Sequence, residues 1–276
     1  MVSKRLLSAA ACLAALAAAS AAAAAAPLAS HRAAYDISLI DPDSPSLGST
    51  QAPVAASGMI AYEFRGSACD GYTSSFRQRT EMERSEGVPV TMDVSATSFE
   101  AGDGASMRFK IDTTGVRDAP PVAGTATRGA DDDLKVELTE PAEKTIDFGR
   151  DVLFPTQHVE RLIQAARDGG GVAQARVYDG SDTGAKIYAT MAVIGKEARK
   201  PSEDASSAAA LESVRRWPVV VSYFNEESKD SAPEYTLSYD LYENGVSGSL
   251  KLDYGSFALR ARLKTLEILP VTACAK

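Results

Sequence analysis

The sequence has few of the side chains that most often carry out catalysis. Its 276 residues include three cysteines, two histidines and one tryptophan. A catalytic triad would have to use His31 or His158, and no GxSxG motif accompanies any serine. No HExxH motif and no Cys/His cluster is present, so the sequence offers no recognisable metal site. These absences predict a protein that is not an enzyme and that holds no metal ion or cofactor.

The acidic motifs are also weak evidence for a site. Residues 179–184, DGSDTG, resemble the start of an EF-hand loop, but Thr190 stands where the bidentate glutamate should be, so a tight hairpin turn is favoured. The carboxylates of residues 131–133 point in different directions, which favours a solvated loop. A glycosidase-type pair of carboxylates stays open, because its spacing is spatial. The single tryptophan, Trp217, argues against an aromatic carbohydrate platform.

Long apolar runs are absent after the amino terminus. Lys4 and Arg5 precede an apolar stretch at 6–19, and a run of alanines follows, which together indicate a signal peptide over residues 1–26. An uncleaved anchor is the alternative. Cys12 could mark a lipidation site, but its preceding alanines lack the Leu or Val of such sites, so we expect it to be discarded with the signal. The remaining residues, 27–276, then form a single exported domain.

The exported chain keeps two cysteines, Cys69 and Cys274. In an oxidising compartment two cysteines most simply form one disulfide. The bridge would close a loop of about 200 residues and could contribute roughly 5 kcal/mol in the chain-entropy model. The alternative is two independent thiols, although no histidine lies near either cysteine in the sequence to activate it.

The net charge excludes one class of partner. The chain carries a formal charge of −8, and loss of Lys4 and Arg5 with the signal makes it more negative. Nucleic acids and anionic membrane surfaces are therefore disfavoured as primary partners.

Period-2 alternation dominates the rest of the chain and predicts about a dozen strands. Asn244-Gly245 lies between two such runs and predicts a hairpin with a type I′ turn. The strands follow one another without helical crossovers, so we expect an antiparallel sheet, and so many strands must curl or split. The predicted strand segments are 33–40, 58–66, 71–87, 88–101, 104–115, 133–140, 144–150, 172–180, 185–199, 215–227 and 233–270, the last of which holds several strands.

One segment has helical spacing instead. Within residues 154–171, apolar side chains recur as on one face of a helix, with Thr156 as the expected N-cap and Gly169–Gly171 as the stop signal. We expect this helix to pack on the concave face of a coiled sheet, barrel or spiral. Residues 201–213 have few large apolar groups and indicate a mobile loop or a frayed helix.

Five blocks follow one another along the chain: HRAAYDISL, SGMIAYEFRGSACDGYTSSFRQR, DFGRDVLFPTQHVERLIQAARDGG, VYDGSDTGAKIYAT with AVIGK, and a cysteine near the carboxyl terminus. Together these blocks resemble the EipB family of periplasmic cell-envelope integrity proteins. The resemblance implies a periplasmic β-spiral, a long antiparallel sheet wound into an incomplete barrel around one main helix. It also implies a Cys69–Cys274 disulfide, a non-enzymatic role in the envelope, and no catalytic residues. Such a bridge would fasten the beginning and the end of a winding that hydrogen bonds alone do not close.

Three functions then compete. The first is support of the cell envelope by binding another periplasmic or outer-membrane-associated protein. The second is a periplasmic carrier of lipid or lipoprotein, which an apolar concavity left empty by the helix would favour. The third is a hydrolase of wall polymer that uses a carboxylate pair or His158.

Overall fold

The computed structural model describes residues 27–40, 52–115, 119–198, 202, 204, 209–229 and 231–270. Within these residues it contains fifteen strands, one α-helix and one short 3-10 helix. The strands are β1 His31–Leu39, β2 Ala55–Ser67, β3 Gly71–Glu83, β4 Val90–Glu100, β5 Ser106–Thr114, β6 Ala119–Arg128, β7 Leu134–Glu140, β8 Lys144–Asp147, β9 Val152–Leu153, β10 Gly171–Val177, β11 Tyr188–Ile194, β12 Arg216–Asn225, β13 Tyr235–Tyr242, β14 Ser247–Asp253 and β15 Ala258–Ile268. The α-helix is α1, Pro155–Arg167, and the 3-10 helix η2 is Ala209–Leu211.

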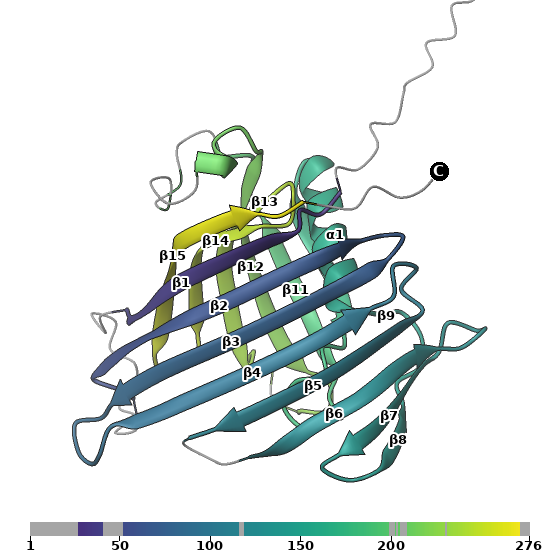
Figure 1. The fold of residues 1–276 in the computed structure, drawn as a ribbon, viewed down its shortest axis with the longest axis horizontal. Coiled ribbons are helices and arrows are strands. Elements are labelled where there is room, and N and C mark those ends of the chain that lie inside the picture. Colours follow the sequence, from purple (N-terminus) through teal and green to yellow (C-terminus); the bar gives the residue numbers. More distant parts are fainter. Residues whose placement is uncertain are drawn as a thin grey trace, which may run out of the picture.

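All fifteen strands belong to one sheet in the order β8-β7-β6-β5-β4-β3-β2-β1-β15-β14-β13-β12-β11-β10-β9. Every pairing is antiparallel except that of β9 with β10, which confirms the expected kind of sheet. Figure 1 shows β1 to β6 as one wall of the molecule, with β11 to β13 behind it. The long sheet therefore winds back on itself, as the sequence predicts.

The first and last strands of the described chain meet in the middle of the sheet. β1 pairs with β15 over its whole length, from His31 opposite Ile268 to Leu39 opposite Leu259. The free edges are β8 and β9, which come from the middle of the chain. Hydrogen bonds do not close the winding, as expected, but the expectation that the beginning and the end of the chain form its open ends is wrong, because the open place lies between β8 and β9.

One arginine bridges the two free edges. Residues 148–151 are all that separates β8 from β9 along the chain. Arg176 of β10 donates to the carbonyls of Arg150 at 2.7 Å and Phe148 at 3.2 Å. Its guanidinium also pairs with Glu226, with Nε 2.6 Å from Oε1. The sheet is thus an incomplete barrel, and Arg176 holds the short connection between its two edge strands.

The N-cap of helix α1 lies two residues before the predicted one. Its N-cap is Phe154 and not Thr156, and Pro155 occupies the first helical position, where its missing N–H costs nothing. The Gln157 side chain accepts a hydrogen bond from the Phe154 N–H at 3.0 Å. At the other end Gly169 and Gly170 adopt positive φ of 111° and 77°, and the Gly170 N–H bonds the Ala165 carbonyl, which confirms the predicted stop.

The helix fills much of the space inside the winding. Leu162, Ile163 and Ala166 are buried against side chains from both walls. Phe64 and Tyr72 come from β2 and β3, whereas Val219 and Leu241 come from β12 and β13. The predicted apolar helix face and its packing on the concave side of the sheet are both confirmed.

Two details of the strands differ from the prediction. β6 has no counterpart among the predicted strands, because its sequence APPVAGTATR holds almost no large apolar residue, although Ala126 is fully buried. The hairpin at Asn244-Gly245 exists, but among its turn residues only Gly245 has positive φ. The Tyr242 carbonyl accepts from the Gly245 N–H, and the Tyr242 N–H bonds Val246, so the loop is a three-residue turn ending in a left-handed glycine and not a type I′ turn.

Candidate functional site

The two cysteines predicted to pair can be placed only in part. Cys69 lies in the turn between β2 and β3, and Cys274 lies outside the described residues. Ser30 connects the neighbourhoods of the two, because its carbonyl accepts from Leu269 N–H at 2.8 Å and its Oγ from Gly66 N–H at 3.1 Å. Leu269, near the end of the described chain, therefore lies at the same end of the sheet as the β2–β3 turn that carries Cys69. The disulfide itself stays a prediction.

Both histidines are buried. His31 donates from Nδ1 to the Ala29 carbonyl at 2.7 Å and lies against the rings of Tyr62 and Phe64. His158 lies in the first turns of α1, with Nε2 3.4 Å from Thr190 Oγ1. Burial, together with the nearby charge of Arg161, lowers the pKa of His158 to about 4, so the ring is neutral at pH 7. Neither imidazole is exposed to a substrate in solution.

The acidic motifs occupy loops. Residues 179–184 lie in the connection between the antiparallel strands β10 and β11, where Asp179 accepts from the Ser181 N–H at 2.9 Å. Residues 131–133 lie between β6 and β7, with Asp132 paired to Arg128 and Asp133 to Arg150. In the part of the chain that the structure describes, no three His, Cys, Asp or Glu side chains gather as a metal site would require.

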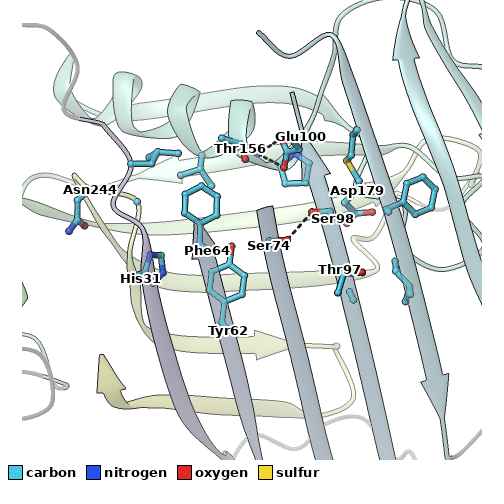
Figure 2. Close-up of a pocket in the computed structure, with 18 residues that line it drawn as sticks. His31, Tyr62, Phe64, Ser74, Thr97, Ser98, Glu100, Thr156, Asp179 and Asn244 are labelled. Carbon is cyan, nitrogen blue, oxygen red and sulfur yellow. Dashed lines mark hydrogen bonds between the residues drawn. The ribbon is translucent and has the colours of Figure 1, made fainter. Parts of the chain in front are cut away.

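A cavity of about 150 Å³ remains between the β1–β5 wall and the start of α1. Figure 2 shows the side chains around it, with Tyr62 and Phe64 on one side and Glu100, Ser98 and Asp179 on another. Its walls are largely apolar, and the polar groups gather where β4 meets the helix. The lining residues are Leu28, His31, Tyr62, Phe64, Ser74, Ala96, Thr97, Ser98, Glu100, Met107, Phe109, Ile111, Pro155, Thr156, Val159, Asp179, Asn244 and Gly245.

Glu100 is the main ionisable group of this cavity. It ends β4 on the inward face, and both carboxylate oxygens accept from the Thr156 backbone N–H at the start of α1, at 3.0 and 3.3 Å. Burial, together with the charge of Glu160, nevertheless raises the pKa of Glu100 to about 7. The cavity therefore holds a carboxyl group that changes its charge near neutral pH.

The outer face of the sheet carries a second feature, an exposed apolar row across three strands. Val172 of β10 lies opposite Val193 of β11, which lies opposite Val220 of β12. Met191 lies two residues before Val193 on the same face. The exposed fractions are 67% for Val172, 49% for Val193, 40% for Val220 and 39% for Met191. We call these four residues the outer apolar row.

The sequence reasoning missed both features. The alternation that places Val90, Met92 and Val94 on one face of the strand also places Glu100 on that face. A carboxylate on the apolar face of a predicted strand was thus the sequence signal for a buried ionisable group. The outer apolar row has a signal too, since residues 188–194 are apolar in both phases of the strand. Its three strands become neighbours only through the sheet order, which the local sequence does not state.

Comparison with known proteins agrees with this architecture. A sequence profile described as EipB-like matches residues 22–270. The cell envelope integrity protein EipB of Brucella abortus strain 2308 is 34% identical over 254 residues, which are 90% of this chain and 89% of that protein. A crystal structure from Brucella abortus, described as a beta-barrel-like protein of domain of unknown function DUF1849, superposes with a TM-score of 0.78 at 32% identity, covering 88% of this chain and 99% of the other.

The fold and the buried cavity define a class of mainly β proteins in which a long sheet winds around one helix without closing. The chain belongs to the EipB family. Among the described residues, no helix is long and apolar enough to cross a bilayer.

Proposed function

We propose that this protein works in the periplasm, without catalysis, and supports the integrity of the cell envelope by binding another envelope protein. The role follows from membership of a family whose Brucella relative is named a cell envelope integrity protein. The observation that supports binding to another protein is the outer apolar row. Contiguous exposed apolar side chains on a folded domain commonly mark a contact surface, because their hydration is unfavourable.

The state of the ionisable groups supports a role without catalysis. His158, the best candidate for a base, is buried and neutral, and its Nε2 lies near the Thr190 hydroxyl. Glu100 is buried inside the winding and accepts a hydrogen bond from the Thr156 N–H. A second carboxylate lines the cavity at Asp179, but it accepts from Ser181. Polymer of the cell wall is too large to enter a cavity of about 150 Å³.

The same volume argues against carriage of a lipid or lipoprotein acyl chain. Sites for drug-sized ligands typically span about 300–1,000 Å³. The helix side chains Leu162, Ile163 and Ala166 occupy the concave space where an acyl chain would lie. We therefore favour the protein-binding role over a lipid carrier.

The proposal is tested by complementation of a strain that lacks this protein. Val193→Lys combined with Val220→Lys places two charges in the outer apolar row while leaving the inward side chains intact. We expect this variant to be exported and folded but to restore growth on detergent medium at least tenfold less well than the unchanged protein. The reason is the cost of burying a charge in an apolar contact.

The matched control is Met59→Lys. Met59 is 50% exposed on β2, but its cross-strand neighbours are Asp36 and Arg79, so it belongs to no apolar row. This variant should restore growth fully. Full restoration by the double variant at an equal periplasmic level would contradict the proposed contact surface. A failure of His158→Ala, in a protein that still folds, would favour catalysis instead.

A further inference from the structure

The chemistry of the inner cavity restricts what it can bind. None of its 18 lining residues is lysine or arginine, whereas two are acidic, Glu100 and Asp179. His31, the remaining ionisable nitrogen base of the lining, has a pKa that burial lowers. The cavity therefore has no cation to pair with a carboxylate or a phosphate, and it would repel such a ligand once Glu100 is ionised.

Among the described residues, no cationic side chain faces Glu100. The groups that face it are Tyr62 from β2, Tyr72 from β3 and Glu160 from α1, and interaction with the Glu100 charge contributes to the raised pKa of both tyrosines. The Thr156 N–H and side chain supply hydrogen bonds but only the partial charge of a helix start. Burial raises the pKa of Asp179 too, but hydrogen bonds from Ser181 and the charge of Lys186 oppose this shift. Glu100 is thus the group that a ligand cation would stabilise.

The apolar part of the cavity fits a short hydrocarbon stem. The rings of Tyr62, Phe64 and Phe109 and the side chain of Ile111 line it. Its volume of about 150 Å³ equals that of an engineered protein cavity that accommodates a benzene ring, so it has room for about six carbon atoms. Thr156 stands beside Glu100 at one end of this space, and Ser98, two residues earlier on the same face of β4, shares a hydrogen bond of 2.8 Å with Ser74 (Figure 2).

We propose that the cavity binds a primary ammonium group on an apolar stem of about six carbon atoms, with the ammonium against Glu100 and the stem among the aromatic rings. The ammonium would donate to the Glu100 carboxylate and to the Ser98 hydroxyl. Two sources share this chemistry, a small free amine and the side chain of a lysine presented by another molecule. This inference goes beyond the proposed function, because it concerns the inside of the winding and not the outer apolar row.

The test is calorimetric titration of the full exported chain with matched probes. These are n-hexylamine, n-hexanol, hexanoate and a short lysine peptide with blocked ends. We expect an amine probe to bind at least tenfold more tightly than hexanol at pH 8, and hexanoate not to bind. Affinity for the amine should fall about tenfold from pH 8 to pH 6, because Glu100 becomes protonated while the amine stays charged.

Two variants and one control assign the effect to the cavity. Glu100→Gln should remove at least tenfold of the amine affinity together with its pH dependence. Ala96→Leu should block the probe by filling the cavity, since Ala96 lines it. Glu137→Gln, an exposed carboxylate of β7 paired with Lys135, should change nothing.

The outcomes are distinct. Binding of hexylamine alone supports a free amine as the ligand, binding of the lysine peptide alone supports a presented lysine, and binding of both supports the shared chemistry. Equal or tighter binding of hexanoate, unchanged binding to a folded Glu100→Gln variant, or no heat with either amine at millimolar concentration would overturn the proposal. None of these results depends on Val193 or Val220. The test of the amine site is therefore independent of the test of the proposed function.

Discussion

At the scale of single residues, the buried carboxyl of Glu100 sets how stability depends on pH. Its pKa is about 7 in the folded protein against 4.5 for an ordinary glutamate, because burial disfavours the charged form. The folded state therefore holds its proton more tightly than the unfolded state. The stabilisation is fully present below pH 4.5 and is lost as the pH rises through about 7.

We predict that Glu100→Gln removes this loss. The unchanged protein should lose on the order of 3 kcal/mol of unfolding free energy through this group between pH 4.5 and pH 8, and the variant should not. Urea unfolding at both pH values measures the difference. Glu137→Gln serves as the control at an exposed site. Parallel pH profiles for Glu100→Gln and the unchanged protein would show that Glu100 is not the group responsible.

Single residues also show where sequence reasoning ends. The alternation of the sequence places Tyr35 and Ile37 on one face of a strand, and both are buried in β1. The same alternation could have flagged Glu100, but its pKa depends on the start of α1, 56 residues away. His158 likewise lies against Thr190 of β11, 32 residues away. Such contacts are tertiary, so the local pattern does not contain them.

At the scale of elements, the strands with large apolar residues were predictable and those without were not. β6 owes its place to pairing with β5 and β7 and not to its own composition. β9 has two residues and pairs only with the end of β10. The pairing of β1 with β15 joins segments more than 200 residues apart, and no local pattern specifies it.

The two short edge elements depend on Arg176. We predict that Arg176→Met, which keeps an apolar stem, frees the carbonyls of Phe148 and Arg150 and breaks the pair with Glu226. Hydrogen bonds to a charged group typically contribute about 1.5–3 kcal/mol, so the variant should lose a comparable amount of stability. Hydrogen exchange of residues 144–153 should accelerate more than that of β12 or β13.

A nearby arginine provides the comparison for this effect. Arg150 is exposed and pairs with Asp133 at 3.4 Å, and surface pairs of this kind typically contribute about 0–1 kcal/mol. Arg150→Met should therefore leave exchange at β8 and β9 nearly unchanged. If the two variants had equal effects, the side-chain bridge between the edges would not be what holds them.

At the scale of the whole molecule, the predicted disulfide would act on the chain and not on the sheet edges. Since β1 and β15 are already hydrogen-bonded, a Cys69–Cys274 bridge would restrict the unfolded chain and tie the segment after β15 to the β2–β3 turn. We predict that Cys69→Ser and Cys274→Ser lower the melting temperature by the same amount and that the double variant adds nothing. A severe effect of one substitution beside a harmless other would exclude the bridge.

The whole molecule also shows what so long a sheet provides. Winding buries one face around α1 and leaves the other as a broad outer surface. On that surface the outer apolar row spans three neighbouring strands, β10, β11 and β12. We regard this surface as what the fold provides to the envelope.

The most direct measurement places a photo-crosslinking amino acid at position 193 in living cells. The account predicts one discrete crosslinked product with another envelope protein, which disappears when Val220→Lys is added. The same amino acid at position 59, equally exposed but outside the outer apolar row, should give no such product. The absence of a product at 193 in a folded, exported protein, or the same product at both positions, would contradict the account.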